Sequence, residues 1–165
     1  MNKWIAGLLI MSCAAASHSA AAWTVQESTS PIDDSKTVLM WVNSSEQIRD
    51  SLGRLQRATI KIQCVENRTG LFVEFGGHYM SHVVNGGMTF RVDSKPAFTR
   101  SMRESTDNSS LGQMGGNAIG IIRQMLGGDV LTVRATPVNS NSVTVQFPIE
   151  GIEEQIQPLR GACNW

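Results

Sequence analysis

Two histidines, His78 and His82, are among the few residues in this sequence whose type and spacing could support chemistry. A separation of four residues places two imidazoles on one face of a helix, as in a zinc site. Glycine pairs at residues 76–77 and 86–87 flank this segment, so a helix is not convincingly indicated there. The remaining histidine lies in a segment that we expect to be removed. We therefore predict two histidines without a ligand role, and no metal or other cofactor.

Two adjacent carboxylates, Asp33 and Asp34, form the second group. Carboxylates can bind calcium or act as general acids, and Asp93 and Asp107 could join them. The pair follows Pro31 in a turn-forming stretch, where aspartate more often accepts hydrogen bonds from backbone amides. No Gly-x-Ser-x-Gly motif is present, so a hydrolase triad is not indicated. We predict a protein that is not an enzyme. The alternative is a cell-wall- or cargo-directed enzyme or ligand-binding domain that uses these aspartates and the histidines.

The first 22 residues have the pattern of a secretory signal peptide. Lys3 supplies positive charge, and residues 4–11 form an apolar run that is too short to span a bilayer as a permanent helix. Ala20 and Ala22 have the small-x-small spacing of a cleavage site, which predicts a mature chain from Trp23. We therefore expect export to the periplasm.

Cys13 allows a second interpretation of the same segment. The preceding residues 10–12 approximate the box of small residues before a lipid-modified cysteine, although Met11 is bulky for it. The protein would then be a membrane-anchored lipoprotein. We expect membrane association only in this case.

Removal of the signal leaves two cysteines, Cys64 and Cys163. In an exported protein, two cysteines most simply form a disulfide, and the alternative is two separate buried thiols. The bridge would close a loop of about 100 residues, for which the chain-entropy model gives roughly 4 to 5 kcal/mol. It would hold in place a C-terminal sequence, RGACNW, that would otherwise fray.

Composition favours one globular domain, residues 23–165, and argues against nucleic acid as a partner. The chain has 165 residues, which suits a single domain. Lys and Arg number 14 and are balanced by 14 Asp and Glu, with no basic block of five or more. Neither nucleic acid nor an acidic membrane surface is indicated by this balance.

Alternation of apolar and polar residues predicts a mainly β fold. Residues 59–65 place Cys64 on the core side, and residues 71–75 follow a turn, which predicts an antiparallel hairpin. Residues 131–135 and 143–147 predict a second hairpin. The other predicted strands are residues 23–27, 37–42, 88–93 and, at an edge, 98–103.

Two short helices complete the expected fold. One covers residues 117–126, and the other begins near Gly151 and is disturbed near Pro158. Residues 43–57 are interpreted as a short surface helix or a loop around Gly53, and residues 105–116 as a loop. These elements favour an α+β fold, an antiparallel β-sandwich or partly open barrel with two short helices packed at its edge.

Seven short motifs, taken in order, resemble the type VI secretion-associated VasI/TagO family. They cover nearly the whole mature chain, and their order and spacing are more specific than any one of them. The motifs are WTV at residues 23–25, SPIDDS at 30–35, IQCVENRT at 62–69, FRVD at 90–93, STDN at 105–108, VRATP at 133–137 and ACNW at 162–165. The usual terminal pattern resembles Cys-Gly-Trp, and here Asn164 takes the middle position.

The resemblance implies an exported, non-catalytic accessory protein of a bacterial type VI secretion system. Its partners would be protein components of the cell envelope or the secretion apparatus. The family brings no catalytic residues, but it brings the cysteine pair Cys64 and Cys163. Four polar motif positions also carry over as a candidate partner surface: Asp33, Asp34, Arg91 and Asp93. We expect the aspartates of the turn at residues 30–35 to reach Arg91.

Overall fold

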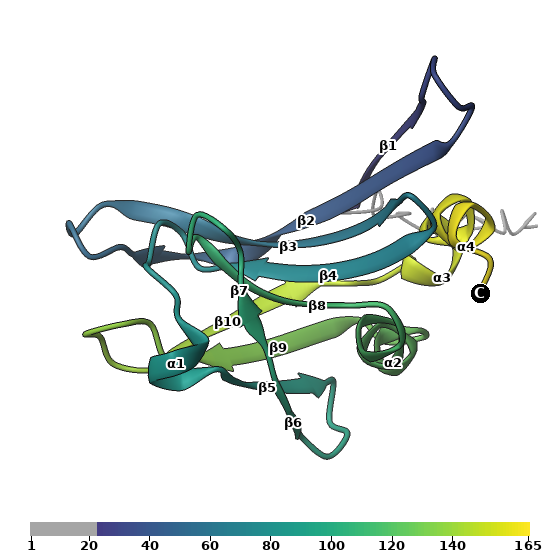
Figure 1. Cartoon of the computed structure of the whole chain (residues 1–165). Coiled ribbons are helices and arrows are strands. Elements are labelled where there is room, and N and C mark those ends of the chain that lie inside the picture. The colour runs from purple at the N-terminus through teal and green to yellow at the C-terminus, as the bar shows by residue number, and fades with distance from the viewer. Residues whose placement is uncertain (1–22) are drawn as a thin grey trace, which may run out of the picture.

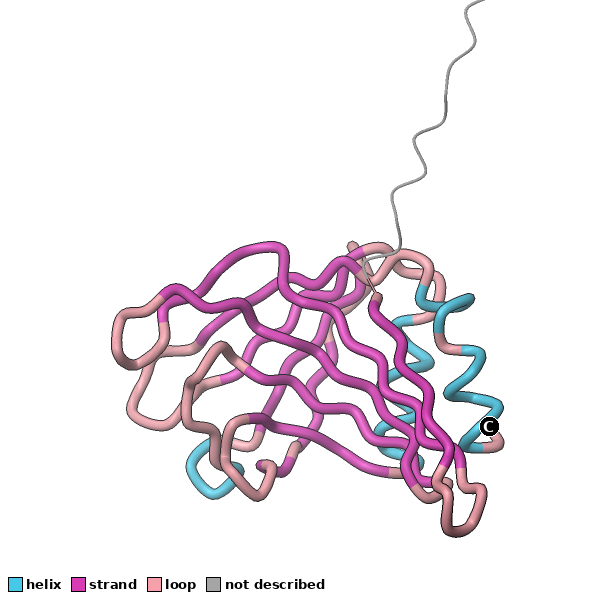
Figure 2. The backbone as a smooth tube through the Cα atoms, turned by 90° about the horizontal axis from the view of Figure 1, so that it is seen from above, coloured by secondary structure: helices cyan, strands magenta, loops and turns pink. Residues whose placement is uncertain are grey.

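The computed structural model describes residues 23–165, and the predicted signal peptide with Cys13 lies outside the described residues. Two antiparallel sheets pack face to face, and most of the helices lie at one end of them (Figures 1 and 2). This arrangement confirms the predicted sandwich, and the described strands form no closed barrel. No helix within residues 23–165 is long and apolar enough to cross a membrane.

The larger sheet has six strands in the order β1-β2-β3-β4-β8-β7. The strands are β1 (Thr24–Thr29), β2 (Lys36–Arg49), β3 (Leu55–Val65), β4 (Arg68–Glu74), β8 (Ser110–Met114) and β7 (Arg103–Glu104). The pairing of β3 with β4 confirms the first predicted hairpin, with Cys64 opposite Thr69.

The smaller sheet has four strands in the order β10-β9-β5-β6. The strands are β10 (Val143–Pro148), β9 (Val130–Ala135), β5 (Gly87–Val92) and β6 (Phe98–Ser101). The pairing of β9 with β10 confirms the second predicted hairpin. Side chains that alternate along both sheets meet between them, and this interface is the hydrophobic core.

The helices close one end of the sandwich. The first predicted helix is α2 (Gly116–Met125), which packs against β4 and β8. The second is divided into α3 (Ile152–Gln155) and α4 (Gln157–Cys163), with a proline in the first turn of α4, and α4 packs against β2 and β3. A further single-turn helix, α1 (His82–Asn85), was not predicted and lies at the opposite end of the sandwich (Figure 1).

The helix proposed within residues 43–57 is wrong. β2 continues to Arg49 and β3 begins at Leu55, so the loop alternative holds only for the turn between them, where Gly53 has a φ of 77°. Pairing decides this segment, because Ile48 lies opposite Gln56 across the hairpin. The carboxylate of Asp50 also accepts a hydrogen bond from the Arg54 amide at 2.8 Å, which closes the turn.

The loop proposed for residues 105–116 is also partly wrong. Residues 110–114 form β8, which pairs with β4 along its whole length. A sequence of Ser-Leu-Gly-Gln-Met has weak strand propensity, so its conformation is imposed by the neighbouring strand. The remaining residues before β8 form the expected turn.

The predicted disulfide joins Cys64 on β3 to Cys163 at the end of α4, with a Cα–Cα distance of 5.8 Å. The tail beyond it is held as well, because the indole N–H of Trp165 donates to Thr69 Oγ1 at 2.8 Å. Asn164 between them has a φ of 53°. Asparagine tolerates this left-handed conformation better than other non-glycine residues, so the chain keeps the turn without the family's glycine.

Candidate functional site

The outer face of the six-stranded sheet carries an apolar surface that no other described element covers. The apolar run at residues 37–42 explains it, because Val38, Met40 and Val42 face the core while Leu39 and Trp41 face outward. We call this surface the sheet face. It consists of the outward side chains of β2, β3, β4 and β8: Leu39, Trp41, Asn43, Thr59, Lys61, Gln63, Phe72, Glu74 and Met114. Its β2–β3 side contains a cavity of about 460 Å³.

The strand register arranges these side chains in rows across the sheet. In one row Trp41 lies opposite Lys61, and Lys61 lies opposite Phe72. In the next row Leu39 lies opposite Gln63, and Met114 completes the row on β8 through Gly70. Paired residues share one side of a sheet, so the two rows form a continuous surface.

Two glycines allow the Phe72 ring to lie against the sheet. A Cβ atom at Gly112 would lie 2.1 Å from Phe72 Cδ1, and one at Gly70 would lie 2.8 Å from Phe72 Cε2. No real side chain fits at such distances, so the ring occupies the space above both backbones. Phe72 is therefore a flat aromatic surface fixed by its neighbours, in the middle of the sheet face.

The charges on the sheet face are nearly balanced. Lys61 Nζ lies 3.0 Å from Glu74 Oε2, and the two side chains are 55% and 33% exposed. An ion pair with this exposure contributes at most about 1 kcal/mol to stability. The sheet face thus combines aromatic and aliphatic side chains with amides and a solvated ion pair, a composition typical of protein interfaces.

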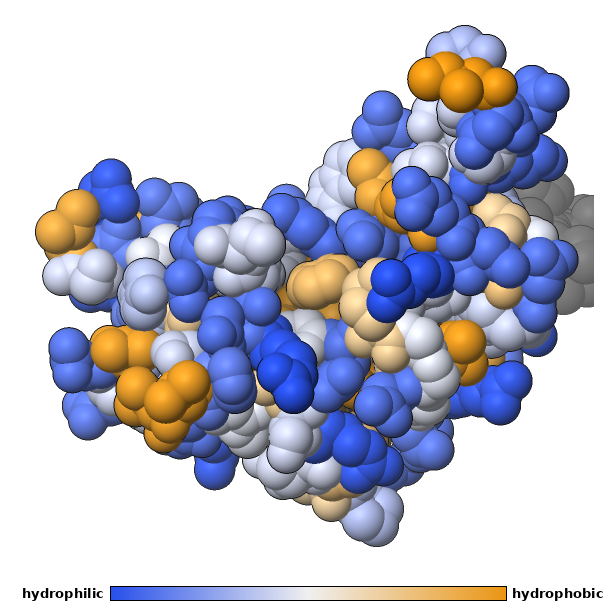
Figure 3. Space-filling view, viewed as in Figure 1, coloured by the Kyte–Doolittle hydropathy of each residue, from blue (hydrophilic) through white to orange (hydrophobic). Residues whose placement is uncertain are grey.

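One side of the sheet face is bordered by the hairpin of β1 and β2, which extends beyond the body of the protein (Figure 1). We call the part of this hairpin around its turn, residues 28–37, the arm. In its turn, Asp33 Oδ1 accepts hydrogen bonds from the amide of Ser35 at 3.2 Å and from its hydroxyl at 2.8 Å. Hydrogen bonds from Ser30 and Ser35 lower the pKa of Asp33. Ile32 at the tip is 93% exposed. Figure 3 shows the hollow between the arm and the other end of the sheet.

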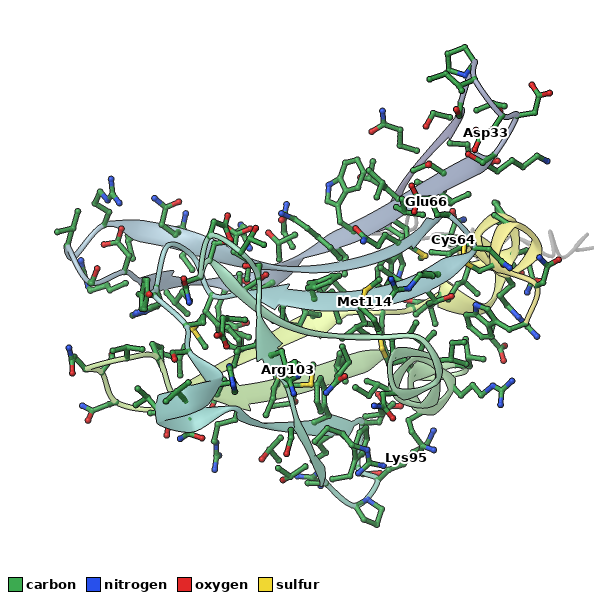
Figure 4. All side chains as sticks on the ribbon, in the orientation of Figure 1. Asp33, Cys64, Glu66, Lys95, Arg103 and Met114 are labelled. Atoms are coloured by element: carbon green, nitrogen blue, oxygen red, sulfur yellow. A yellow bond between two sulfur atoms is a disulfide. The ribbon has the colours of Figure 1, made fainter. Side chains whose placement is uncertain are left out.

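The structure does not bring together the four polar positions predicted as a partner surface. Asp33 and Asp34 lie on the arm, whereas Arg91 lies on β5 of the other sheet and donates to the carbonyl of Lys95 at 3.2 Å. Figure 4 shows Asp33 and Lys95 on opposite sides of the sandwich. The expected approach of the turn to Arg91 is therefore wrong, because the two motifs belong to different sheets.

Asp93 has a local role in the structure. Its Oδ1 accepts hydrogen bonds from the backbone amides of Asp129 at 3.1 Å and Val130 at 2.8 Å. These bonds connect the end of β5 to the start of β9. Arg91 faces solvent.

The histidines are also far from the aspartates. His78 is buried, and its Nε2 lies 2.9 Å from the carbonyl oxygen of Arg49 at the far end of β2. Because β2 has 14 residues, its two ends are separated by roughly 40 Å. His82 instead contacts Glu104 through Nδ1. Within residues 23–165, no group of three or more His, Cys, Asp or Glu residues could hold a metal ion.

The contact between His82 and Glu104 predicts a pH effect on stability. Hydrogen bonds from the His82 amide and then from its ring lower the pKa of Glu104 to about 2. A carboxyl group with a lowered pKa in the folded state stabilises the protein above its unfolded pKa and loses this contribution as the pH falls. The difference in urea midpoint between the wild type and Glu104→Gln should therefore shrink between about pH 4.5 and pH 2. A difference that stays constant over this range would contradict the assignment.

Sequence reasoning missed the principal side chains of the sheet face. The run containing Leu39 and Trp41 predicted a strand without showing that one of its sides is uncovered, and β8 was not predicted. The two glycines beside the Phe72 ring, Gly70 and Gly112, are visible in the sequence. Nothing in the sequence showed that their strands, β4 and β8, are neighbours. Residue-type alternation identifies the two sides of a strand without saying which side is covered.

Comparison with known proteins identifies a family and a similar fold. Over residues 8–165 the sequence matches the family described as type VI secretion system VasI, EvfG. Among solved structures, the crystal structure of invasion associated protein b from Bartonella henselae is similar, with a TM-score of 0.53 over 90% of this chain and 98% of that chain. The two sequences are 12% identical, so this likeness shows a shared fold alone. No curated protein matches the chain.

Proposed function

Since this chain belongs to the type VI secretion system VasI family, we propose that it is a non-catalytic accessory protein that binds a protein component of the secretion apparatus through the sheet face. The single observation that supports this proposal is a row on the outside of a sheet in which Lys61 lies between the half-buried aromatic residues Trp41 and Phe72, with the exposed Leu39 beside it. Apolar side chains gathered on an uncovered face and surrounded by polar residues commonly mark an interaction site.

The chemistry of the sheet face favours a protein as the ligand. Aromatic side chains contribute strongly to protein interfaces because they bury a large area with little loss of conformational freedom. Phe72 is held by Gly70 and Gly112, so little further ordering is needed when a partner binds. Amides and the Lys61–Glu74 pair supply polar contacts around these anchors.

The arm would extend this surface. It carries Asp33, Asp34 and the exposed Ile32 beyond the body. A partner that lies on the sheet face can therefore also contact these side chains. β1 is the last strand on its side of the sheet, and a free strand edge can pair with an extended segment of another protein. We assign Asp33 and Asp34 to the partner surface and leave Arg91 and Asp93 outside it.

We assign the protein to the periplasm, where it would act after export. The signal pattern of the first 22 residues supports this location, and so does the disulfide between Cys64 and Cys163, because disulfides form in oxidising compartments. Mass spectrometry of the exported protein tests the location and the N-terminus. A measured mass equal to that of a chain starting at Trp23 supports a soluble periplasmic protein. A mass that shows a lipid on Cys13 supports the membrane-anchored alternative.

Site-specific cross-linking tests the sheet face. A photo-reactive amino acid at Leu39 should cross-link to a protein encoded with the secretion apparatus, and the same group at Val130 should not. Val130 is a matched control, because it and Leu39 are both 37% exposed and lie on different sheets. The double change Leu39→Ala and Trp41→Ala should reduce the recovered complex about tenfold, while Val130→Ala leaves it unchanged.

The same measurement separates the arm from the sheet face. Reversing the charge at Asp33 and Asp34 should preserve folding and reduce recovery of the partner if the arm contributes. Equal recovery by the wild type and the Leu39 and Trp41 variant would overturn the proposed function, and normal secretion by a clean deletion strain would count against it.

A further inference from the structure

The end of the sandwich opposite α2 and α4 presents an unusual number of exposed apolar side chains. We call it the loop end. It consists of the tip of the β2–β3 hairpin, residues 49–57, the segment at residues 76–86 that contains α1, and the β9–β10 turn, residues 136–142. Five of the eight large hydrophobic residues that are exposed within residues 23–165 lie here: Leu52 (74%), Leu55 (52%), Tyr79 (56%), Val83 (80%) and Val84 (64%). Figure 3 shows separate hydrophobic groups at this end of the molecule.

Hydrogen bonds hold the three segments together. His78 Nε2 lies 2.9 Å from the carbonyl of Arg49, which connects the segment at residues 76–86 to the β2–β3 hairpin. The amide of Val138 donates to the carbonyl of Tyr79 at 2.9 Å, which connects the same segment to the β9–β10 turn. The apolar side chains are therefore presented on a connected framework.

The charges of the three segments are positive. Arg49 and Arg54 flank Leu52, and Arg57 follows shortly after. Asp50 is the one acid in these segments, and its side chain is fully buried and lies 2.7 Å from Arg54 Nε. Burial alone would raise the pKa of Asp50, but hydrogen bonds from the amide and side chain of Arg54 lower it.

Two acids on neighbouring strands and loops lie close to these segments. Glu104 on β7 is paired with His82. Asp107, in the turn before β8, accepts hydrogen bonds from Ser105 at 2.6 Å and from the Ser109 hydroxyl at 2.9 Å. Both carboxylates are thus engaged locally, and apart from the buried Asp50 the three segments carry only apolar, neutral polar and basic side chains.

We propose that the loop end binds the surface of an anionic lipid bilayer. Leu52, Val83 and Val84 would enter the boundary between headgroups and acyl chains, while arginines at the rim contact lipid phosphates. Tyr79 suits the same boundary, because its ring is apolar and its hydroxyl can remain hydrated. Separate exposed aliphatic side chains surrounded by polar groups suit membrane binding, because each can enter the lipid without a continuous apolar surface around it.

This mode of membrane contact is independent of the sheet face and of lipid attachment. The sequence alone indicated a membrane only through Cys13, and nothing in its overall charge suggested an acidic surface. The loop end lies at one end of the sandwich and the arm extends from the other, so a bilayer bound at the loop end would leave the sheet face and the arm open to a protein partner (Figure 1).

Vesicle sedimentation tests the proposal with the oxidised protein recovered after export, whose mass shows an unmodified chain. The wild type should bind vesicles that contain phosphatidylglycerol and bind phosphatidylcholine vesicles weakly. Binding to the anionic vesicles should decrease as salt rises from about 0.05 M to about 0.5 M, because salt screens the arginines. The variant Leu52→Gln with Val83→Gln should bind at least about tenfold more weakly.

Ile32→Gln is the control, because Ile32 is even more exposed (93%) than Leu52 (74%) or Val83 (80%) but lies at the tip of the arm. It should bind anionic vesicles like the wild type, and urea midpoints equal to that of the wild type would show that all variants are folded. The proposal is overturned if the wild type leaves anionic vesicles unbound, if it binds neutral vesicles equally well, or if the loop-end variant binds like Ile32→Gln. A wild type that does not bind vesicles, together with a loop-end variant that no longer recovers a protein of the secretion apparatus, would assign this end to a protein partner instead.

Discussion

Replacing Cys64 and Cys163 with alanine should lower the free energy of unfolding by about 2 to 5 kcal/mol, the typical loss for a native disulfide in a small exported domain. The bridge spans 99 residues, so the reduced unfolded chain gains the freedom of a long loop. It also connects the central strand β3 to α4, which closes one end of the sandwich. Loss of the bond should therefore destabilise the whole domain.

Urea unfolding followed by tryptophan fluorescence measures this effect. Reduced wild type is the matched control, because reduction breaks the bond and retains both sulfur atoms in the core. It should lose most of the stability that the double alanine variant loses. Equal stability of the oxidised and reduced wild type would contradict the role given to the bridge, and two free thiols in exported protein would contradict the pairing itself.

Gly112→Ala should be the second most disruptive change, with an expected loss of about 1 to 3 kcal/mol. The new Cβ atom would lie 2.1 Å from the Phe72 ring and 2.8 Å from the carbonyl oxygen of Leu71. The ring would have to leave its position on the sheet face, and the β4–β8 pairing would have to shift. We therefore expect weaker binding of the secretion partner as well as lower stability.

A double change separates these two causes. Phe72→Ala in the Gly112→Ala background removes the ring and should recover part of the loss, since only the backbone contact remains. Gly120→Ala is the control, because a Cβ atom at this position of α2 has no heavy atom within 4 Å. It should raise stability by about 0.5 to 1 kcal/mol through helix propensity. If the Gly112→Ala variant loses the same unfolding free energy with and without Phe72→Ala, the contact with the ring is not the cause of the loss.

Local patterns in the sequence predicted much of the fold. Alternation placed Ile60, Ile62 and Cys64 on the core side of β3, and the structure buries all three completely. The turn at residues 30–35 was predicted to be ordered by its side chains, and Asp33 does accept hydrogen bonds from Ser35. Such features depend on residues a few positions apart, so a single sequence contains the information.

The failures share one cause, which is contact between distant segments. β8 is a strand because β4 lies beside it, and β2 runs on to Arg49 because it pairs with β3. The candidate site shows the same limit. Asp33 and Arg91 carry charges that suggested a single cluster, but the order of the strands places them on different sheets.

The sequence by itself determined the cysteine pair, both principal hairpins and a chain composition without a recognisable catalytic motif. Only the tertiary structure decided that Leu39, Trp41 and Phe72 lie together on the outer face of one sheet, and that the exposed apolar side chains of two distant segments meet at one end. The physical reason is that periodicity along a chain specifies which residues share a side of a strand. Which side is buried, and which loops become neighbours, depends on how whole strands are ordered in the sheets.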